Sequence, residues 1–519
     1  MYSSVETAIL HGIYSIPVLV EADVSDGLPM FEMVGFLASE VKESKERVRT
    51  ALKNSGYLLP PKRITVNFTP ANIRKSGSGF DLPIAIAVLA ALGMLSGAYG
   101  KNLLDKDLLI LGEVGLDGTT KPIAGILPMV AEAKERGMTH CIVPWENVEE
   151  AKLIAGMTVW GADSIKTAMQ IIQTGIYEEP QKPYNIEETA NEETMPDFAD
   201  VHGQKMAKRA CEIAASGMHN LLLIGPPGAG KTMLASRIPT ILPGLLEEER
   251  MELSKIYSVS GLMKKGMKLV ENRPFRAPHH TITAQGLAGG GAIPKPGEIS
   301  LAHKGVLFLD ELPEFQKNTL EILREPMEEK KISLVRLNAS YEYPADFMLV
   351  AAMNPCKCGY YPDVRRCSCT KSAVERYLGR ISRPLLDRMD LCVETAMVSY
   401  ADLKASGKEE SSRVIRSRVE AARQIQRERY QGEPFFYNSQ IPAGRLEEYC
   451  ALSHAQEQYM ERVYRRLNLT ARSYHKILKV ARTIADLEGS RQITDGHLNE
   501  AVCYRDMDLK YWNGNGGEA

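Results

Sequence analysis

The chain has 519 residues and a formal net charge of −2, and 25% of its residues are charged. This length exceeds what one hydrophobic core supports, so we expect two or three domains. The near-neutral balance excludes a global basic field, and any contact with nucleic acid must come from a local patch. No apolar run approaches the ~20 residues of a membrane span, and no export signal opens the chain, so we expect a cytoplasmic protein without membrane contact.

Residues 1–172 alternate β-rich runs with helical stretches, which predicts an α+β or α/β domain. The expected strands are 16–24, 64–68, 108–111 and 140–143, and the expected helices include 81–95 and 128–136. Residues 173–200 are rich in glutamate and interrupted by proline. Because few of their side chains can support a core, we expect an acidic linker.

Residues 201–397 read as strand, glycine-rich loop, helix and strand, an order that indicates a parallel sheet with right-handed crossovers. The expected elements are a helix over 205–215, strands at 219–224, 305–309 and 347–353, and helices over 232–238 and 317–327. Residues 398–506 are almost wholly helical and predict a lid, with helices over 413–430, 446–467, 471–487 and 495–504. Residues 507–519 are expected to form a flexible tail.

The glycine-rich loop has the strongest motif of the chain. Its residues are Gly225, Pro226, Pro227, Gly228, Ala229, Gly230, Lys231 and Thr232, which fit the spacing GxxxxGK[ST] between a strand and a helix. Glycines let backbone N–H groups converge on phosphate oxygens, and the helix amino terminus adds a partial positive charge. We expect Lys231 to contact the β- and γ-phosphates of ATP and Thr232 to bind Mg²⁺.

Polar residues follow the next two expected strands. Asp310 and Glu311 lie where a parallel strand leaves the sheet, at the edge where such folds bind ligands. Asp310 is expected to hold the Mg²⁺ shell, and Glu311 to polarise the water that attacks the γ-phosphate. Asn354 could reach between the γ-phosphate and this water, and the alternative is a capping residue before Pro355.

Two arginines farther along the chain are candidates for contact with the phosphoryl group. Arg388 lies in a predicted helix over 380–390, and an arginine supplied by a neighbouring subunit can neutralise transition-state charge. An internal ion pair with Asp387 or Asp390 is the alternative. Arg472 lies in the first turn of an amphipathic helix, where the lid of an AAA+ ATPase carries a nucleotide-sensing arginine.

A family resemblance rests on Phe275–Phe315, Met353–Asp363 and Ala471–Gly489, which with the first domain cover nearly the whole chain. These stretches resemble the magnesium-chelatase-like AAA+ ATPases of the ComM/YifB type. The resemblance implies a hexameric ATPase acting on single-stranded or branched DNA, as a helicase for branch migration in homologous recombination and natural transformation, with recombination proteins as partners. It also implies an AAA+ parallel-sheet domain with a helical lid after a Lon-protease-like α+β domain. The alternative is a chelatase subunit that remodels a partner protein, which the helical carboxyl-terminal region disfavours.

The Lon-like resemblance of the first domain raises a third function, an ATP-dependent protease. Lon-type cleavage uses a serine–lysine dyad. Alignment with the serine loop of that family places Asp81 at the nucleophile, although Ser76 and Ser78 lie close, and alignment with the lysine segment places Leu127 at the lysine. We therefore expect a non-catalytic domain that binds DNA or builds the ring.

Four of the nine cysteines form two close pairs, Cys356 with Cys358 and Cys367 with Cys369. Four thiolates at this density suit tetrahedral Zn²⁺, although CxC is tighter than the common CxxC. Reduced cysteines in a loop of other purpose are the alternative. If zinc is bound, the sequence predicts that its removal weakens ring assembly or coupling rather than nucleotide binding.

Other polar features leave alternatives open. His279 and His280 are expected in a loop facing DNA or an interface rather than at a metal. The glycines at 289–291 with Lys295 could line a ring channel, or form a plain surface loop. Arginines are dense between residues 413 and 429, where a solvated face is the default and a phosphate track the alternative, at Arg413, Arg416, Arg418, Arg423, Arg427 and Arg429. Arg482 is expected to be structural.

Overall fold

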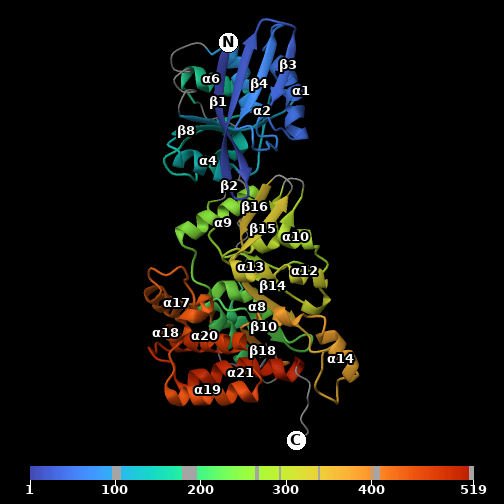
Figure 1. The fold of residues 1–519 in the computed structure, drawn as a ribbon, viewed down its shortest axis with the longest axis vertical. Coiled ribbons are helices and arrows are strands. Elements are labelled where there is room, and N and C mark those ends of the chain that lie inside the picture. Colours follow the sequence, from blue (N-terminus) through green and yellow to red (C-terminus); the bar gives the residue numbers. More distant parts are fainter. Residues whose placement is uncertain are drawn as a thin grey trace.

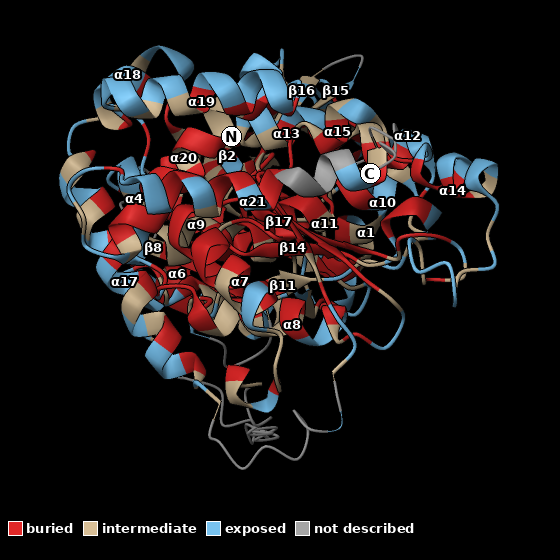
Figure 2. Ribbon diagram, turned by 90° about the horizontal axis from the view of Figure 1, so that it is seen from below, coloured by how far each residue is buried: buried red, intermediate tan, exposed pale blue. Residues whose placement is uncertain are grey.

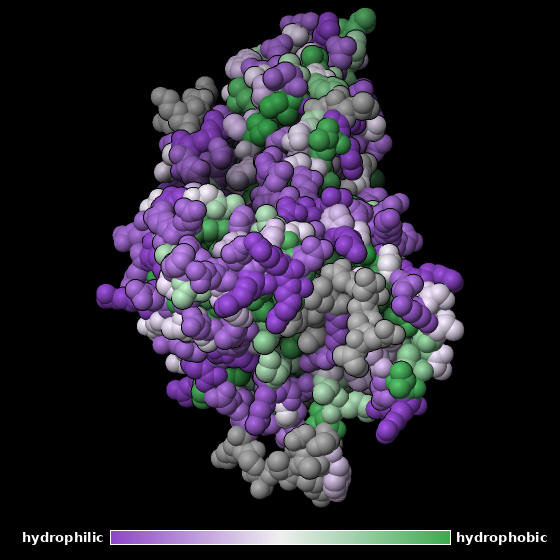
Figure 3. All heavy atoms as spheres, turned by 60° about the horizontal axis from the view of Figure 1, so that its bottom comes forward, coloured by the Kyte–Doolittle hydropathy of each residue, from purple (hydrophilic) through white to green (hydrophobic). Residues whose placement is uncertain are grey.

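The computed structural model describes residues 1–95, 107–177, 196–263, 268–291, 294–336, 339–398, 400 and 409–512. An amino-terminal domain stands at one end of an elongated molecule, above a second α/β domain whose far side carries the carboxyl-terminal helices (Figure 1). The face seen in Figure 3 is mostly hydrophilic, with small scattered apolar areas. Within the described ranges, no helix combines the length and the apolar character that crossing a membrane requires.

The amino-terminal domain is built on a mixed seven-stranded sheet in the order β3-β4-β2-β1-β5-β8-β9. Its strands are β1 Tyr2–His11, β2 Tyr14–Ser25, β3 Met30–Val34, β4 Arg63–Thr69, β5 Leu108–Ile110, β8 His140–Pro144 and β9 Thr158–Ala162, and β6 Glu113–Val114 and β7 Thr120–Lys121 form a separate pair. The predicted strands 16–24, 64–68, 108–111 and 140–143 match β2, β4, β5 and β8, whereas the sequence analysis missed β1, β3 and β9.

Helices cover both faces of this sheet. Apolar side chains of α1 Ser39–Asn54, α2 Asp81–Ala91 and α6 Ile165–Thr174 pack against one face, and those of α4 Ile126–Glu135 and α5 Val148–Ala151 against the other. Helix α2 is buried along nearly its whole length, because it crosses the centre of the sheet. This explains the apolar composition that predicted a helix over 81–95, although α2 ends at Ala91.

The second domain contains a five-stranded parallel sheet in the order β11-β14-β17-β10-β18. Its strands are β11 Phe275–Arg276, β14 Val306–Leu309, β17 Met348–Met353, β10 Leu221–Ile224 and β18 Leu391–Glu394. Four of them, all but β11, consist almost entirely of buried residues, and Figure 2 shows β14 and β17 inside a shell of helices. A strand buried on both faces needs apolar residues without alternation, as the sequence predicted.

Helices and hairpins surround this sheet. On one side lie α7 Lys205–Gly217 and α8 Lys231–Ile241, and around the rest are α9 Glu247–Val259, α10 Ala284–Ala288, α11 Glu298–Leu301, α12 Lys317–Glu321, α13 Arg324–Glu329, α14 Lys371–Leu378 and α15 Arg383–Leu386. Two hairpins project from it, β12 Gly289–Gly290 with β13 Lys295–Pro296, and β15 Lys331–Arg336 with β16 Ala339–Pro344. Gly289 and Gly290, for which the sequence left a ring-channel segment or a plain surface loop open, therefore belong with Lys295 to a short hairpin.

Proline explains why two predicted helices differ in extent from the structure. A third, expected over 446–467, is interrupted at residues 450–453, which are not helical. The helix expected over 317–327 is divided into α12 and α13, because Pro326 lacks the N–H that a continuous helix would need there. The helix expected over 380–390 is reduced to α15, which begins one residue before Pro384. Proline is favoured at the first helical turn and disfavoured deeper inside.

The ends of two predicted segments also differ from the structure. Within the predicted acidic linker 173–200, residues 178–195 lie outside the described part, but Phe198 is fully buried in the core of the second domain. The predicted tail begins too early, because α21 runs from Asp495 to Trp512. Tyr511 is buried near Tyr361 and donates a hydrogen bond to Glu394, which holds the last turn against β18. Residues 513–519 lie outside the described residues.

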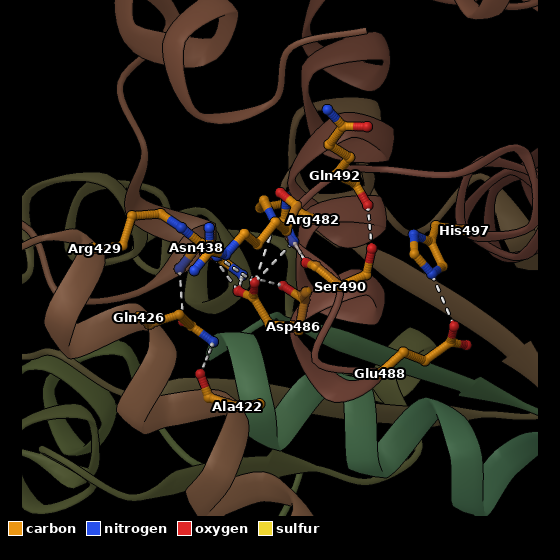
Figure 4. Close-up of polar contacts among 12 residues, drawn as sticks. Ala422, Gln426, Arg429, Asn438, Arg482, Asp486, Glu488, Ser490, Gln492 and His497 are labelled. Atoms are coloured by element: carbon orange, nitrogen blue, oxygen red, sulfur yellow. Dashed lines mark hydrogen bonds and ion pairs between the residues drawn. The ribbon is translucent and has the colours of Figure 1, made fainter.

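The carboxyl-terminal helices, predicted to form a lid, pack on α7 and α8. They are α17 Ser412–Arg429, α18 Leu446–Tyr449, α19 His454–Arg466, α20 Ala471–Leu487 and α21. Asp486 lies buried at their centre, where Arg429, Asn438 and Arg482 all donate hydrogen bonds to its carboxylate (Figure 4). A buried carboxylate needs such partners, and Arg482 is therefore structural, as predicted.

The arginine-rich stretch on α17 is mostly engaged within the chain. Arg423 is buried and donates to the carbonyl oxygen of Ala215, and Arg418 pairs with Glu212 and Glu410. Together with the pair between Arg429 and Asp486, these contacts remove three of the six arginines from any phosphate track. The other three lie on the solvated surface that was the default prediction, at Arg413, Arg416 and Arg427.

Candidate nucleotide site

The predicted phosphate loop joins the carboxyl end of β10 to the amino end of α8. Gly228 and Gly230 have φ angles of 77°, a left-handed conformation that glycine adopts without strain. A cavity of about 420 Å³ opens over the loop, and its walls include Asp310, Glu311 and Asn354. The structure therefore brings the acidic pair and the predicted sensor to the loop, as parallel strand ends at one sheet edge require.

Lys231 lies at the centre of this edge. Its Nζ donates to the carbonyl oxygens of Gly225 and Pro226, at 2.8 and 2.9 Å, and to Oδ1 of Asn354 at 3.0 Å. Burial lowers the pKa of Lys231, while the charges of Asp310 and Glu311 oppose that shift. A desolvated ammonium beside two carboxylates is prepared to exchange its carbonyl partners for phosphate oxygens.

The predicted Mg²⁺ ligands are in contact. Oγ1 of Thr232 donates to Oδ2 of Asp310 at 2.6 Å, so a hydroxyl and a carboxylate oxygen face the same point. Oxygen ligands of this kind suit Mg²⁺, which in phosphate sites completes its shell with water and substrate. The residues present therefore fit the ion that the sequence predicted.

Glu311 follows Asp310 in the chain and has a φ of 51°. Its side chain is exposed to solvent. Nδ1 of His280 lies 3.3 Å from Oε2 of Glu311, and the rings of His279 and His280 are 4.1 Å apart. No prediction from the sequence connected His280 with the acidic pair. In the structure, His280 follows β11, the parallel neighbour of β14, and so emerges at the same sheet edge.

A second cavity of about 710 Å³ adjoins the phosphate loop on the β18 side, and sequence reasoning missed it. Its walls include Gln204, Pro226, Tyr360 and Thr395. Nε2 of Gln204 donates to the carbonyl oxygen of Ala229 at 3.0 Å, which attaches this wall to the loop itself. Apolar and aromatic walls with a few amide groups are typical of a pocket for a planar base.

Arg388 and Arg472 lie at the opposite edge of the sheet. Asn220, the residue before β10, donates to the carbonyl oxygen of Arg388 at 3.1 Å, whereas the phosphate loop begins after β10. Five residue steps of extended chain separate Asn220 from Gly225, about 16 Å at ~3.3 Å per residue. Neither arginine therefore reaches the phosphate loop of its own chain.

Glu328 on α13 connects the two arginines. Its Oε1 accepts from Nη2 of Arg388 at 2.6 Å and from Nη2 of Arg472 at 2.7 Å. Arg388 is buried, and its Nε has no hydrogen-bond partner among the described residues. The predicted alternative, an ion pair with Asp387 or Asp390, does not form, because Asp390 pairs with Lys476 at 2.8 Å instead.

The four predicted metal ligands come together in the loop after Asn354. The Sγ atoms of Cys356, Cys358, Cys367 and Cys369 all lie within 4.8 Å of one another. Burial raises the pKa of the Cys358 thiol, but N–H groups of Tyr360 and Ser368 and neighbouring thiols outweigh this and lower it to about 6.

The protease dyad expected of a Lon-type domain is absent at the aligned positions. Asp81 is fully buried and accepts hydrogen bonds from Nε and Nη2 of Arg47, at 2.9 and 3.0 Å. Leu127 is also buried, and its N–H faces Glu150 and Oγ of Ser258 on α9. The first position carries a structural ion pair, and the second forms part of the contact with the second domain.

The parallel sheet, the phosphate loop and the acidic strand end define a P-loop nucleotide-binding protein. Three family models match it: magnesium chelatase, subunit ChlI, over residues 197–403; subunit ChlI of Mg-chelatase over residues 20–147; and magnesium chelatase, subunit ChlI C-terminal, over residues 409–505.

Relatives extend the match to nearly the full length. The chain is 42% identical to YifB of Salmonella typhimurium over 506 residues, 97% of each chain, and 40% identical to competence protein ComM of Haemophilus influenzae over 502 residues, 96% of each. Lon protease 2 of Bacillus subtilis matches at 29% over 152 residues, 29% of this chain and 26% of that protein. The chain belongs to the ComM/YifB type of the magnesium-chelatase-like AAA+ ATPase family.

Proposed function

We propose that this protein is a ring-forming ATPase that acts on DNA, as a helicase or branch-migration factor in homologous recombination and natural transformation. The observation that carries the ATPase role is the connected set of Lys231, Thr232, Asp310 and Asn354 around one cavity. The loop from Gly225 to Thr232 binds the phosphates of ATP, and the cavity beside Gln204 takes the base.

Hydrolysis needs one water molecule activated at the γ-phosphate. Glu311 accepts a proton from this water through a carboxylate oxygen, the water oxygen bonds to the γ-phosphorus, and the bond to the β–γ bridging oxygen breaks. Thr232 and Asp310 would hold a Mg²⁺ ion, which would supply charge neutralisation at the phosphates. Lys231 stabilises the same charge, and Asn354 orients the γ-phosphate and the water.

The position of Arg388 and Arg472 supports a ring. About 16 Å of strand separates them from the phosphate loop of their own chain, so they act on nucleotide only if they face the loop of a neighbouring subunit. A closed ring repeats this head-to-tail contact at every interface. A homo-hexamer is the ring that we propose, with Arg388 neutralising transition-state charge and Arg472 sensing the nucleotide.

Two hairpins support an action on DNA. The guanidinium of Arg336 on β15 lies against Gly290 on β12, so the hairpins meet, and exposed Lys295 and Arg336 give this region positive charge. The relative named for competence, 40% identical over nearly its full length, points in the same direction. Single-stranded or branched DNA and recombination proteins are the partners that we propose.

The remaining assignments concern domains and metal. We propose that residues 1–172 form a non-catalytic domain joined by the linker 173–200 to an ATPase core over 201–397 and a lid from 398. Residues 201–397 also carry a Zn²⁺ ion at the four cysteines. Proteolysis is disfavoured, because Asp81 and Leu127 occupy the positions at which a Lon-type protease has its serine and its lysine. Remodelling of a partner protein is the second candidate function, which the match to the chelatase family models supports.

ATPase activity measured with buffer, single-stranded DNA, four-way DNA or casein tests these functions together. DNA-specific stimulation, with strand displacement that Lys231→Ala abolishes, is the expected result. Casein cleavage supports a protease, and ATPase activity indifferent to every DNA leaves the remodelling function.

A further inference from the structure

We propose that a thiophilic divalent cation bound by the four cysteines holds one wall of the nucleotide site, so that nucleotide affinity depends on this metal. The inference rests on the proposed nucleotide site. It goes beyond a structural zinc ion, because it gives the ion a role in binding ATP.

The thiol geometry fits a metal rather than disulfides. The sulfur of Cys356 lies 3.3 Å from that of Cys358 and 3.8 Å from that of Cys367, and Cys358 is 3.5 Å from Cys367. Tetrahedral zinc with Zn–S bonds of ~2.3 Å separates its sulfurs by about 3.8 Å, whereas a disulfide needs ~2.05 Å. The backbone N–H of Tyr361 also points at Cys356 Sγ, 3.4 Å away, as in the outer shell of metal–thiolate sites.

The loop that carries the cysteines needs such a crosslink. Residues 354–370 contain neither helix nor strand, yet Cys356 and Val374 at its two ends are buried in one core. Ordering so long an irregular segment is costly in conformational entropy, and a metal bound at four points offsets that cost. The loop is thus expected to be ordered with metal and loose without it.

This loop touches the phosphate loop directly. A Cβ added to Gly359, between Cys358 and Tyr360, would lie only 2.4 Å from Cδ of Pro227. Only glycine at position 359 therefore allows the cysteine loop to pack on Pro227. The φ of Gly359 is 86°, a left-handed conformation that also favours glycine. A metal ion that holds Cys358 in place therefore also holds the neighbouring Gly359 against Pro227 of the phosphate loop.

The same loop forms the wall of the base cavity. Tyr360, Tyr361 and Arg366 line it, and the guanidinium of Arg366 stacks over the Tyr360 ring at 4.2 Å from its centre. At the loop's start, Asn354 accepts a hydrogen bond from Lys231. The segment that carries the cysteines therefore borders the nucleotide site at three places: the proposed base cavity, the phosphate loop, and Asn354 near the expected position of the γ-phosphate. This changes the expectation from sequence, because metal loss should weaken nucleotide binding and not ring assembly alone.

The test measures metal content and nucleotide affinity on the full-length protein. Elemental analysis should find one zinc per chain. Affinity for a fluorescent ATP analogue should fall at least about tenfold when an organomercurial with a chelator removes the metal, and should return with added Zn²⁺. Absence of metal from the wild type, or an unchanged affinity after complete removal, overturns the proposal.

Variants separate the metal from its coupling. Cys367→Ser/Cys369→Ser should lose zinc and bind the analogue weakly, while Gly359→Ala should keep zinc and still bind weakly. Val364→Ser is the matched control, since Val364 lies in the same loop with 90% of its surface exposed, and it should change neither quantity. A Gly359→Ala protein with wild-type affinity overturns the coupling.

Lys231→Ala distinguishes this proposal from the proposed function. It should hold one zinc while binding no nucleotide, because Lys231 lies outside the cysteine cluster. A wild-type protein that holds zinc but never binds ATP overturns the ATPase function and the coupling, whereas its metal site stands.

Discussion

The two edges of the parallel sheet differ in what their charged groups contact. At the carboxyl edge, Lys231 donates a hydrogen bond to Asn354 and Thr232 donates one to Asp310, and both pairs lie beside an open cavity. At the amino edge, Arg388 and Arg472 share the carboxylate of Glu328. One edge carries the groups that we propose bind phosphate, and the other carries two arginines remote from the phosphate loop of the same chain. In the proposed ring, a single chain would therefore supply half of each of two catalytic sites.

The pairing with Glu328 gives this division a further consequence. In the proposed ring, an arginine that reaches a neighbour's γ-phosphate would exchange a carboxylate oxygen for a phosphate oxygen. Glu328 pairs with both arginines but balances only one of their two charges. We expect substitutions of the arginines at the amino edge to lower ATP turnover only in the assembled ring. Substitutions at the carboxyl edge should lower ATP binding in free subunits and in the ring alike.

The largest effect is expected at the carboxyl edge. Lys231→Ala should abolish detectable ATP binding and turnover, because the phosphates lose their one buried ammonium contact in the loop. Fluorescent-nucleotide titration checks it, with Lys255→Ala on α9 as a surface lysine control. Binding within threefold of wild type would show that this edge is not the phosphate site.

At the amino edge, Arg388→Ala should lower kcat by about 10³-fold, the range for an arginine that neutralises the transferred phosphoryl group. ATP affinity of the free subunit should not change, because Arg388 is remote from the loop. Arg380→Ala, which removes an exposed pair with Glu314, is the matched control. A parallel loss of affinity in free subunits would place Arg388 at its own nucleotide.

Glu311→Gln should retain ATP binding and lower kcat by about 10²-fold or more, because an amide cannot accept the proton of the attacking water. Single-turnover hydrolysis measures this step. Turnover equal to that of the wild type would remove Glu311 from the mechanism and leave the carboxyl edge as a binding site alone.

The smallest effect concerns the stability of the amino edge. Burial lowers the pKa of His219 to about 4, against the opposing charge of Asp390, and its Nε2 contacts Oγ1 of Thr483 in the lid. The unfolded chain, with a histidine pKa of about 6.5, binds this proton first as pH falls. The contribution of neutral His219 to the free energy of unfolding is therefore fully present above pH ~6.5. It is lost progressively as the pH falls to ~4, and the total loss is at most about 3 kcal/mol.

Urea unfolding at pH 7.5 and 5.0 measures this dependence. His219→Gln should lose less stability between the two pH values than the wild type, whereas His454→Gln, a change at an exposed histidine, should behave like the wild type. If the wild type and His219→Gln lose the same unfolding free energy between pH 7.5 and 5.0, burial of neutral His219 does not stabilise the contact with Thr483.

Local patterns predicted the carboxyl edge well, because each of its parts lies within a few residues of an apolar strand. The phosphate loop, Asp310, Glu311 and Asn354 are all found where the strand ends required. His280 was missed because its strand, β11, has only two residues and too little apolar sequence to be noticed. The cavity beside Gln204 was missed because its walls come from segments as far apart in the sequence as Gln204 and Tyr511.

Long-range contacts also account for the errors in the fold. Strand β1 carries Ser4 and Glu6 on one face, and β3 has only five residues, so both gave a weak apolar signal. Pairing with β2 and β4 fixes them in the sheet. The arginines of α17 suggested a solvated face, but Glu212 and Asp486, distant in sequence, pair with them. Neither partner could be identified from spacing within the helix.

A mixing experiment tests the division of the site between two chains most directly. Lys231→Ala and Arg388→Ala subunits are each expected to be inactive alone. When they are combined, some interfaces join an intact phosphate loop from one variant to an intact Arg388 from the other, so ATPase activity should reappear and peak near equal amounts. Activity that stays at zero at every ratio, in rings shown to contain both variants, would contradict a site shared between subunits.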